Sequence, residues 1–361
     1  MTKVLSDIGA RYVRPLNVKG GKYTDNDLNM IGFGISPKAE IAMMDAMDSL
    51  TAPITTPSVG VPGQFLQHML SGSVLVATSP RKIDEFVGIV TAGDWSQEEV
   101  IQRALEYTGG TVPYADYQAP SLAGYNVNFE RRTIVRFENS MRVGQLEEAR
   151  ASAIGENSAA NSRAAATLAL DIKRNSVGFV GFNSGNNRTY GFLNDPGLSA
   201  YVTVATGAAS STTWALKTFK ERQADITEAF GALVTQSGGI ISTSDNITIA
   251  IPHTHQGYFG EVNDYGISLT SWLKTAYPNA RVINAPQLEN ANGAAEVFYM
   301  YAENVNDGST DDGAVWAQVV PAKFRVQGAA KLSKYYEESY TNATAGAMCK
   351  RPWGVIRRSG I

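Results

Sequence analysis

The segment from residue 93 to residue 139 constrains the fold most, because it predicts two long strands that pair as a hairpin. Residues 124–139 (GYNVNFERRTIVRFEN) alternate between apolar and polar side chains, with a shift after Phe129 that a β-bulge would explain. Residues 97–108 predict the partner strand, and the loop between them is rich in Gly, Pro and Tyr. An isolated two-stranded hairpin is only marginally stable in water. The predicted hairpin therefore needs a surface to lie on, supplied either by this chain or by a neighbouring copy.

A long alanine-rich segment follows at residues 144–177 and predicts a helix with an apolar stripe along its second half. One continuous helix of that length would be roughly 50 Å long. Gly155 and the Asn/Ser cluster at 157–162 are the two places where it could break. The Gly- and Asn-rich run GFVGFNSGNNRTYGFLNDPGL then ends any helix.

Residues 213–236 predict a second amphipathic helix, which opens an α/β arrangement. The loop at residues 304–313 is acidic and predicts a flexible turn in solvent, whereas residues 324–361 return as strongly basic strands. That basic end would suit phosphates or, at least as well, an acidic neighbouring surface. The remaining predicted elements are four strands and one helix: Ile247–Ile251, Ser268–Ala276 (the helix), Arg281–Ala285, Glu296–Ala302 and Val315–Val320.

Composition limits the functions open to this chain. Charged residues make up only 18% of it and give a net charge of −3, which argues against a protein that mainly grips nucleic-acid phosphates. The single cysteine, Cys349, excludes an internal disulfide framework and favours a buried structural thiol. The sequence carries no secretory signal and no apolar run long enough to cross a membrane. These features predict a soluble protein made in a reducing cytoplasm, with no membrane partner.

The histidines give the one candidate for metal chemistry. His253 and His255 follow an apolar run and could share a strand face to bind zinc, but a catalytic zinc needs a third protein ligand. Neither His68 nor a carboxylate stands at a supporting spacing, so loop histidines that cap the next helix are the favoured alternative. The sequence also lacks a phosphate-binding loop and a nucleophile elbow. It therefore predicts neither an enzyme nor a cofactor.

Near the start of the chain, Ser36 and Pro37 predict the beginning of a short helix. Ile41, Met44 and Met47 lie at helical spacing along it and form an apolar stripe. Because this helix is far from any core of its own in the sequence, it should dock on another surface, either of its own chain or of a neighbouring copy.

The order of these parts resembles the major capsid protein of tailed phages with the Hong Kong 97-type fold. Three segments carry the resemblance to one family in that group: TPSVGVP at 56–62, GFLNDPGL at 191–198 and TNATAGAMCKRPWGVIRRSGI at 341–361. The resemblance spans nearly the whole chain. It departs from many relatives in lacking an N-terminal scaffolding domain, and numbering from Met1 does not suggest removal of an arm by a maturation protease.

The resemblance implies an α+β Hong Kong 97-type capsid fold with an N-arm, a hairpin called the E-loop, a P-domain with a long spine helix, and an α/β A-domain. The implied division is 1–60 for the N-arm, 61–92, 131–212 and 322–361 for the P-domain, 93–130 for the E-loop, and 213–321 for the A-domain, with the spine helix at about 144–177.

The resemblance also implies roles for particular residues. Contacts between subunits are expected from tyrosines of the hairpin and from the apolar stripe of the N-arm, and an acidic loop is expected near the capsomer axis. Packing on their own hairpin is the alternative for Tyr114 and Tyr117. The implied residues are Tyr107, Tyr114, Tyr117 and Tyr125 in the E-loop, Ile41, Met44 and Met47 in the N-arm, and Asp307, Asp311 and Asp312 in the axis loop.

The implied function is self-assembly into hexamers and pentamers of an icosahedral phage head that encloses double-stranded DNA without sequence-specific binding. Portal, scaffold or decoration proteins would be further partners, and assembly would take place in the bacterial host cytoplasm before the protein becomes part of the virion. Two alternatives are an encapsulin-like nanocompartment shell and a soluble metal-dependent hydrolase that uses His253 and His255.

Overall fold

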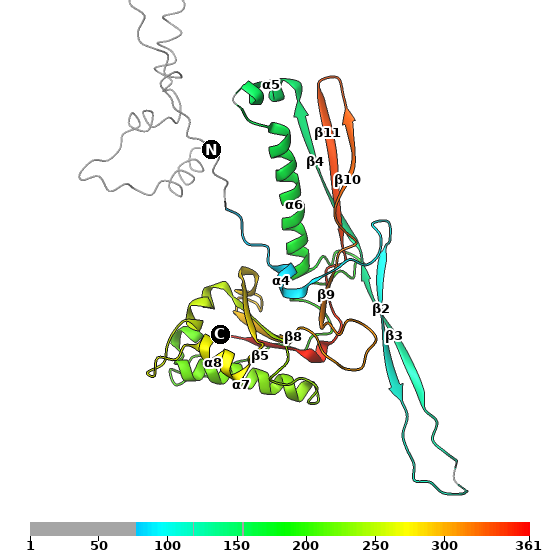
Figure 1. Ribbon diagram of the computed structural model, residues 1–361, viewed down its shortest axis with the longest axis vertical. Helices are drawn as coiled ribbons and strands as arrows, with labels where there is room; N and C mark the ends of the chain where they lie inside the picture. The colour runs from blue at the N-terminus through cyan, green and yellow to red at the C-terminus, as the bar shows by residue number, and fades with distance from the viewer. Residues whose placement is uncertain (1–76, 118, 154) are drawn as a thin grey trace, which may run out of the picture. The chain divides into compact units, whose positions relative to one another are not determined.

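The computed structural model describes residues 77–117, 119–153 and 155–361. The predicted N-arm at 1–60, with its helical stripe of Ile41, Met44 and Met47, lies outside the described residues. His68 lies outside them as well. The described part combines helices with four β-sheets, as an α+β fold requires (Figure 1).

The largest sheet has five strands in the order β5-β13-β8-β6-β7. Its three inner strands, β13, β8 and β6, are buried at every residue, because other layers cover both of their faces. Strands β6 and β7 run parallel, and helix α8 (Leu269–Ala276) lies between them in the chain. The strand bounds are Val202–Thr203 for β5, Val355–Ser359 for β13, Val297–Ala302 for β8, Ile247–Pro252 for β6 and Arg281–Ala285 for β7.

Helix α7 (Phe219–Gln236) begins where its sequence provides a cap. The side chain of Thr218 and that of Glu221 form a capping box, in which each accepts from the backbone of the other. The helix therefore starts six residues later than predicted, after a 3-10 turn at Trp214–Leu216. It buries Ile226, Ala229 and Leu233 on one face.

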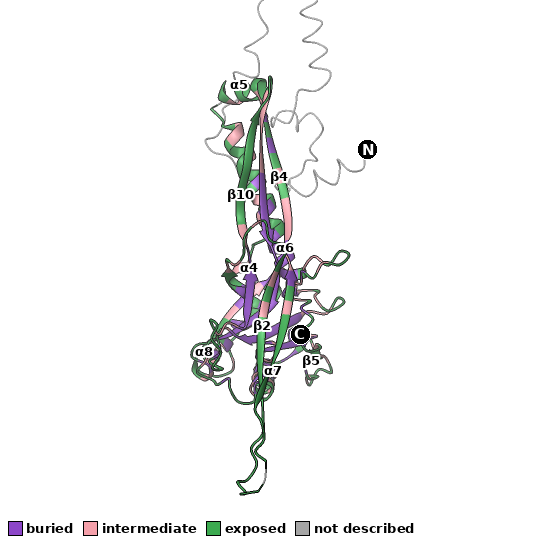
Figure 2. Cartoon of the chain, turned by 90° about the vertical axis from the view of Figure 1, so that its right-hand side faces the viewer, coloured by how far each residue is buried: buried purple, intermediate pink, exposed green. Residues whose placement is uncertain are grey.

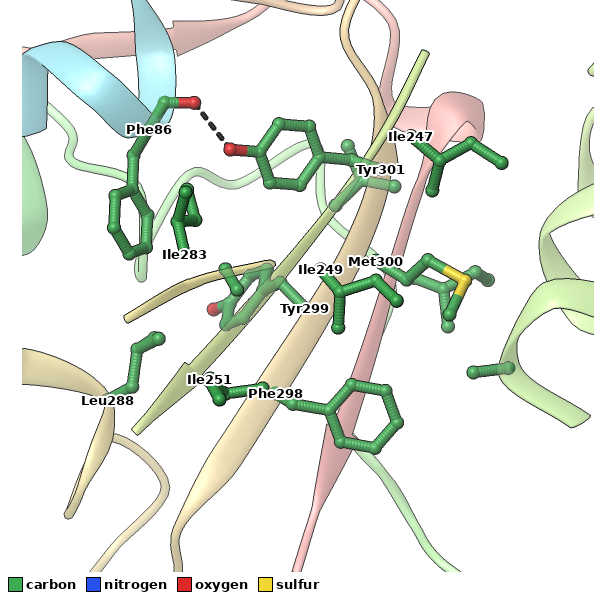
Figure 3. Close-up of a cluster of buried hydrophobic side chains, with 14 of the residues drawn as sticks. Phe86, Ile247, Ile249, Ile251, Ile283, Leu288, Phe298, Tyr299, Met300 and Tyr301 are labelled. Atoms are coloured by element: carbon green, nitrogen blue, oxygen red, sulfur yellow. Dashed lines mark hydrogen bonds between the residues drawn. The ribbon is translucent and has the colours of Figure 1, made fainter. Parts of the chain in front are cut away.

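A cluster of aromatic and aliphatic side chains joins this sheet to helix α4 (Ile83–Val87). Figure 3 shows the hydroxyl of Tyr301, on β8, pointing at the backbone carbonyl of Phe86, to which it donates a hydrogen bond. Burial raises the pKa of Tyr301. The phenol therefore stays protonated and keeps helix α4 attached to the sheet.

The long helix expected at residues 144–177 is interrupted in the structure. Residues 144–177 form two helices, α5 (Gln145–Ala153) and α6 (Ser158–Val180), with Gly155 at a φ of 77° between them. Asn157 caps α6 by accepting from the amide of Ala160. A glycine in a left-handed conformation and an asparagine cap end one helix and start another, so the long helix is α6 alone, roughly 35 Å long.

A three-stranded antiparallel sheet covers α6. Its order is β10-β11-β4, and Met141, Tyr340 and Leu170 form the small core between sheet and helix. Figure 1 shows this layer beside α6. The strand bounds are Ala322–Lys331 for β10, Tyr335–Thr344 for β11 and Val135–Gly144 for β4.

A second small sheet contains β1 (Ile89–Val90), β9 (Trp316–Val319) and β12 (Ala347–Cys349). Strand β9 corresponds to the predicted strand Val315–Val320, which was expected in the α/β arrangement and instead pairs here. Cys349 is buried, as expected, and burial raises the pKa of its thiol.

The remaining sheet is the predicted hairpin. Strand β2 (Glu99–Thr108) pairs with β3 (Gly124–Thr133) along all ten residues of each. The expected bulge after Phe129 is wrong: the chain changes sheets at Ile134, where β3 ends and β4 starts to pair with β11. Ile134 is buried in a cluster with Val319 and Met348. The hairpin therefore ends at this residue, where the chain enters the body of the protein.

The five-stranded sheet draws on segments that the sequence analysis placed in different domains. Its strands β5 and β13 come from the predicted P-domain segments 131–212 and 322–361, and its other three from the predicted A-domain. The division into N-arm, E-loop, P-domain and A-domain stays a prediction.

Candidate functional site

The two faces of the β2–β3 hairpin differ in chemistry. Residues directly opposite each other in an antiparallel pair lie on the same face, and the register pairs Tyr107 with Tyr125 and Leu105 with Val127. Residues two apart along each strand join them on that face. The same face also carries two arginines, Arg103 opposite Phe129 and Arg131 opposite Ile101. We call its six apolar side chains the apolar face of the hairpin: Ile101, Leu105, Tyr107, Tyr125, Val127 and Phe129. We call the set between them the polar face: Gln102, Ala104, Glu106, Asn126, Asn128 and Glu130.

The apolar face is uncovered in the described chain. Tyr107 is 84% exposed, Tyr125 68% and Phe129 54%. Figure 2 shows the outer part of the hairpin as exposed along its length. Monomeric proteins rarely expose a contiguous apolar patch of this kind, and such patches mark interaction sites. The apolar face is therefore the candidate functional site of the described residues.

The loop at the end of the hairpin adds further aromatic surface. Tyr114 is 92% exposed, and Tyr117 and Leu122 are also exposed, so these side chains do not pack on their own hairpin here. The structure thus places all four tyrosines named above on the hairpin or its tip, exposed to solvent. Their contact with another subunit stays a prediction.

The root of the hairpin contains two functional candidates that the sequence analysis missed. Arg132 lies near the end of β3 with a side chain that is 2% exposed, and its Nη2 lies 2.8 Å from Oδ2 of Asp195, which is 1% exposed. The Arg132 guanidinium also lies over the ring of Tyr190, 4.9 Å from its centroid. Sixty-three residues separate the pair, and no local pattern in the sequence connects them.

The acidic loop is not the free turn that its sequence suggested. The guanidinium of Arg351 contacts Asp307 and Asp311, each at 2.6 Å, and the Nζ of Lys350 lies 2.7 Å from Asp312. Hydrogen bonds from Arg351 lower the pKa of Asp307 and bring that of Asp311 to about 2. Part of the basic C-terminal segment therefore neutralises an acidic loop of its own chain. A place for this loop near a capsomer axis stays a prediction.

The two histidines each have their own carboxylate. His253 Nδ1 lies 2.7 Å from Glu289, and His255 Nε2 lies 2.9 Å from Glu296. His255 is buried and stacks on Trp214, and this burial lowers its pKa. Among the described residues, no group of three or more His, Cys, Asp or Glu side chains could hold a metal ion. The structure gives both histidines structural contacts in the region of β6 and β8.

Helix α6 is the longest helix of the described residues, and neither it nor any other helix there is long and apolar enough to cross a membrane.

Solved capsid structures share this architecture. The capsid of Myoviridae phage XM1 aligns with a TM-score of 0.68 at 14% identity, over 84% of this chain and 100% of that one. The capsid of the native GTA particle aligns with a TM-score of 0.55 at 11% identity, over 85% and 99%. The capsid of cyanophage P-SCSP1u gives 0.51 at 12%, over 85% and 99%. The fold is that of Hong Kong 97-type capsid subunits, as expected from the sequence.

Residues 52–360 match the family described as Pa193 gp26 major capsid protein, and the chain belongs to this family. It is accordingly a phage major capsid protein and part of the virion, built into a shell from many copies. This match supports a phage capsid over the encapsulin-like alternative. No curated protein matches the chain.

Proposed function

We propose that copies of this chain form hexamers and pentamers of an icosahedral head, and that the apolar face of the hairpin binds a neighbouring copy. The observation that carries this proposal is a two-stranded sheet with one apolar face that the described residues leave uncovered. An exposed hairpin of this kind is marginal alone. A neighbouring subunit would supply the missing layer.

The energetics favour such a contact. Burying a large apolar side chain contributes about 1.5–3 kcal/mol, and the apolar face offers six of them. Association costs several kcal/mol in lost freedom of motion, so one such contact is modest by itself. A closed symmetric shell repeats the contact at every subunit, which makes the assembly stable without any single tight interface.

The role we propose is structural, without catalysis or a cofactor. The shell would enclose double-stranded DNA without reading its sequence, and a net charge of −3 suits a wall that does not trap the incoming polyanion. Assembly in the host cytoplasm, a portal, and scaffold or decoration proteins belong to the same proposal. So do contacts from the N-arm residues and a place for the acidic loop near the capsomer axis.

The test compares two substitutions that differ only in the face of the hairpin they alter. Leu105→Asp/Val127→Asp places two charges on the apolar face, and Ala104→Asp/Asn128→Asp places two charges on the polar face one register position away. Both target pairs are exposed, so both variants should fold like the wild type.

Electron microscopy and sedimentation of the purified proteins are the measurements. We expect the apolar-face variant to lose closed particles and the polar-face variant to keep them, with equal circular dichroism for the unassembled chains. Equal yields of closed particles from the two variants would refute a docking role for the apolar face.

A further inference from the structure

The hairpin is tied to the body of the protein at two successive points near its root. The first is at Thr133, whose carbonyl accepts a hydrogen bond from the hydroxyl of Thr189 at 2.7 Å. The second lies one residue further out, where Arg132 meets Asp195. Two successive attachment points fix the direction of a ribbon, whereas a single point would leave it free to pivot.

Asp195 is itself held firmly by the body. Its Oδ1 accepts from the amide of Gly197 at 2.9 Å, and its Oδ2 accepts from the amide of Cys349 at 3.1 Å. The carboxylate thus joins a turn after α6, strand β12 and the hairpin root. It cannot follow the hairpin if the hairpin swings, because both of its other partners are backbone groups of the body.

The pair is also costly to break. Arg132 and Asp195 are both almost fully buried, and a charge left there without its partner would have no water to solvate it. Arg132 also contacts Glu130 of its own strand, but the Glu130 side chain is 38% exposed and moves with the hairpin. Among the residues that the structure describes, the bond to Asp195 alone connects the guanidinium to a carboxylate of the body.

Arg188 adds to the attachment at Thr133: its amide donates to Oγ1 of Thr133 at 3.1 Å, and its exposed guanidinium lies 3.9 Å from Glu130. An exposed ion pair of that length contributes little.

Further contacts at the root join the two strands to each other. Arg136 donates to the backbone carbonyls of Trp95 and Gln97, and the amide of Ile134 donates to the carbonyl of Glu98 at 2.8 Å. These bonds keep the root closed. They connect the segment before β2 to the segment after β3.

We propose that the Arg132–Asp195 pair is the positioning element of the hairpin: it fixes the direction in which the apolar face is presented. This inference rests on the proposed function, in which that face binds a neighbouring copy. Ten residues of β-strand span about 33 Å. A rotation of about 10° at the root would therefore move the far end of the strands by about 6 Å, more than an apolar contact tolerates.

The main variant is Arg132→Leu/Asp195→Asn, in which both buried charges are removed together. Removing a buried pair as a whole often leaves stability nearly unchanged, unlike removing one partner. The asparagine keeps one acceptor oxygen, which can accept from one of the two backbone amides that bind Asp195. The matched control is Arg174→Leu/Asp84→Asn, which removes another arginine–aspartate pair, 2.9 Å between Nη2 and Oδ2, that joins α6 to α4 away from the hairpin.

Two measurements are made on the full-length chain. The first is the distance distribution between spin labels at Asn128→Cys on the hairpin and Ala224→Cys on α7, measured on unassembled protein, in which native Cys349 is buried. The second is the yield of closed particles. We expect the main variant to broaden the distribution and to lower the yield at least about tenfold, since a shell repeats the misplacement at every subunit. The control should change neither quantity.

An unchanged distance distribution in the main variant would overturn the inference, and so would a broadened distribution with a normal yield of closed particles. If the main variant melts far below the control, Arg132→Lys replaces it. Lysine keeps the positive charge but lacks the planar fork of donors of a guanidinium. A distance distribution of intermediate width in this variant supports the inference, and a distribution as narrow as that of the wild type overturns it. If the wild-type chain itself forms no shells, the proposed function fails, and the distance measurement alone decides whether the pair positions the hairpin.

Discussion

The β2–β3 hairpin and the central strands β6 and β8 are both rich in apolar side chains, yet they end in opposite environments. Every residue of β6 and β8 is buried within the chain, whereas the hairpin leaves its tyrosines and Phe129 in solvent. The central strands receive helices and loops on both faces from the same polypeptide. An apolar strand in a sequence indicates that another layer must pack on it. Only the tertiary structure shows whether the same chain provides that layer.

The strongest test of this comparison replaces one phenylalanine in each region. Phe298→Ala on β8 should destabilise the unassembled chain by about 3–5 kcal/mol, because the substitution leaves a cavity in a packed core. Phe129→Ala on the hairpin should change the same free energy of unfolding by less than about 0.5 kcal/mol, because the side chain is exposed. Chemical denaturation of both variants measures the difference. Similar losses would mean that the hairpin is covered by its own chain in solution.

The tyrosines at the tip of the hairpin test whether exposed aromatic side chains stabilise the assembled particle. Tyr114→Ala/Tyr117→Ala should leave unfolding of the unassembled chain unchanged, since both side chains are exposed. Particles should disassemble at a lower temperature, because aromatic anchors at an interface contribute about 2 kcal/mol or more each. Calorimetry of particles and of unassembled chains gives both quantities. Wild-type thermal stability of the variant particles would show that these tyrosines are not anchors.

The smallest effect is expected at the acidic loop, an exposed segment that its own chain does hold in place. The pKa of Asp311 is about 2, below the ordinary value of about 3.9, so its bond to Arg351 stabilises the loop above pH 4 and is lost as the pH falls towards 2. Hydrogen exchange of residues 303–313 should increase across that range.

The control for this prediction is Arg351→Gln, which removes the guanidinium whose hydrogen bonds and charge lower the pKa of Asp311. In that variant the increase in exchange should begin near pH 4 and should already be partly present at neutral pH. Identical exchange profiles for the variant and the wild type would show that the ion pair does not hold the loop.

Local pattern predicted much of the fold. Strand β7 has the predicted bounds, and β6 and α8 lie within one residue of theirs, because short apolar runs and a serine cap mark them in the sequence. The pattern could not show which strands pair. Strand β9 leaves the expected arrangement, and β13 enters the large sheet from a distant segment, because such pairings depend on contacts between residues far apart in the chain.

The candidate site, like the fold, has a part that the sequence predicts and a part that it does not. Alternation in the sequence identified the apolar face through Tyr125, Val127 and Phe129. The Arg132–Asp195 pair and the partners of the acidic loop were not predictable, because a buried ion pair leaves no periodic signal in either of its segments. Gly155 was named as one of two possible breaks in the long helix, but only its backbone conformation shows that the break occurs there.

Strand β13 lies between β8 and β5, so the large sheet remains open during translation until residues 355–359 have left the ribosome. Until then β8 has an unsatisfied backbone edge that faces the place of the missing strand. A polypeptide that is truncated before this point cannot complete the sheet. Completion of the large sheet is therefore a late event in the synthesis of each subunit.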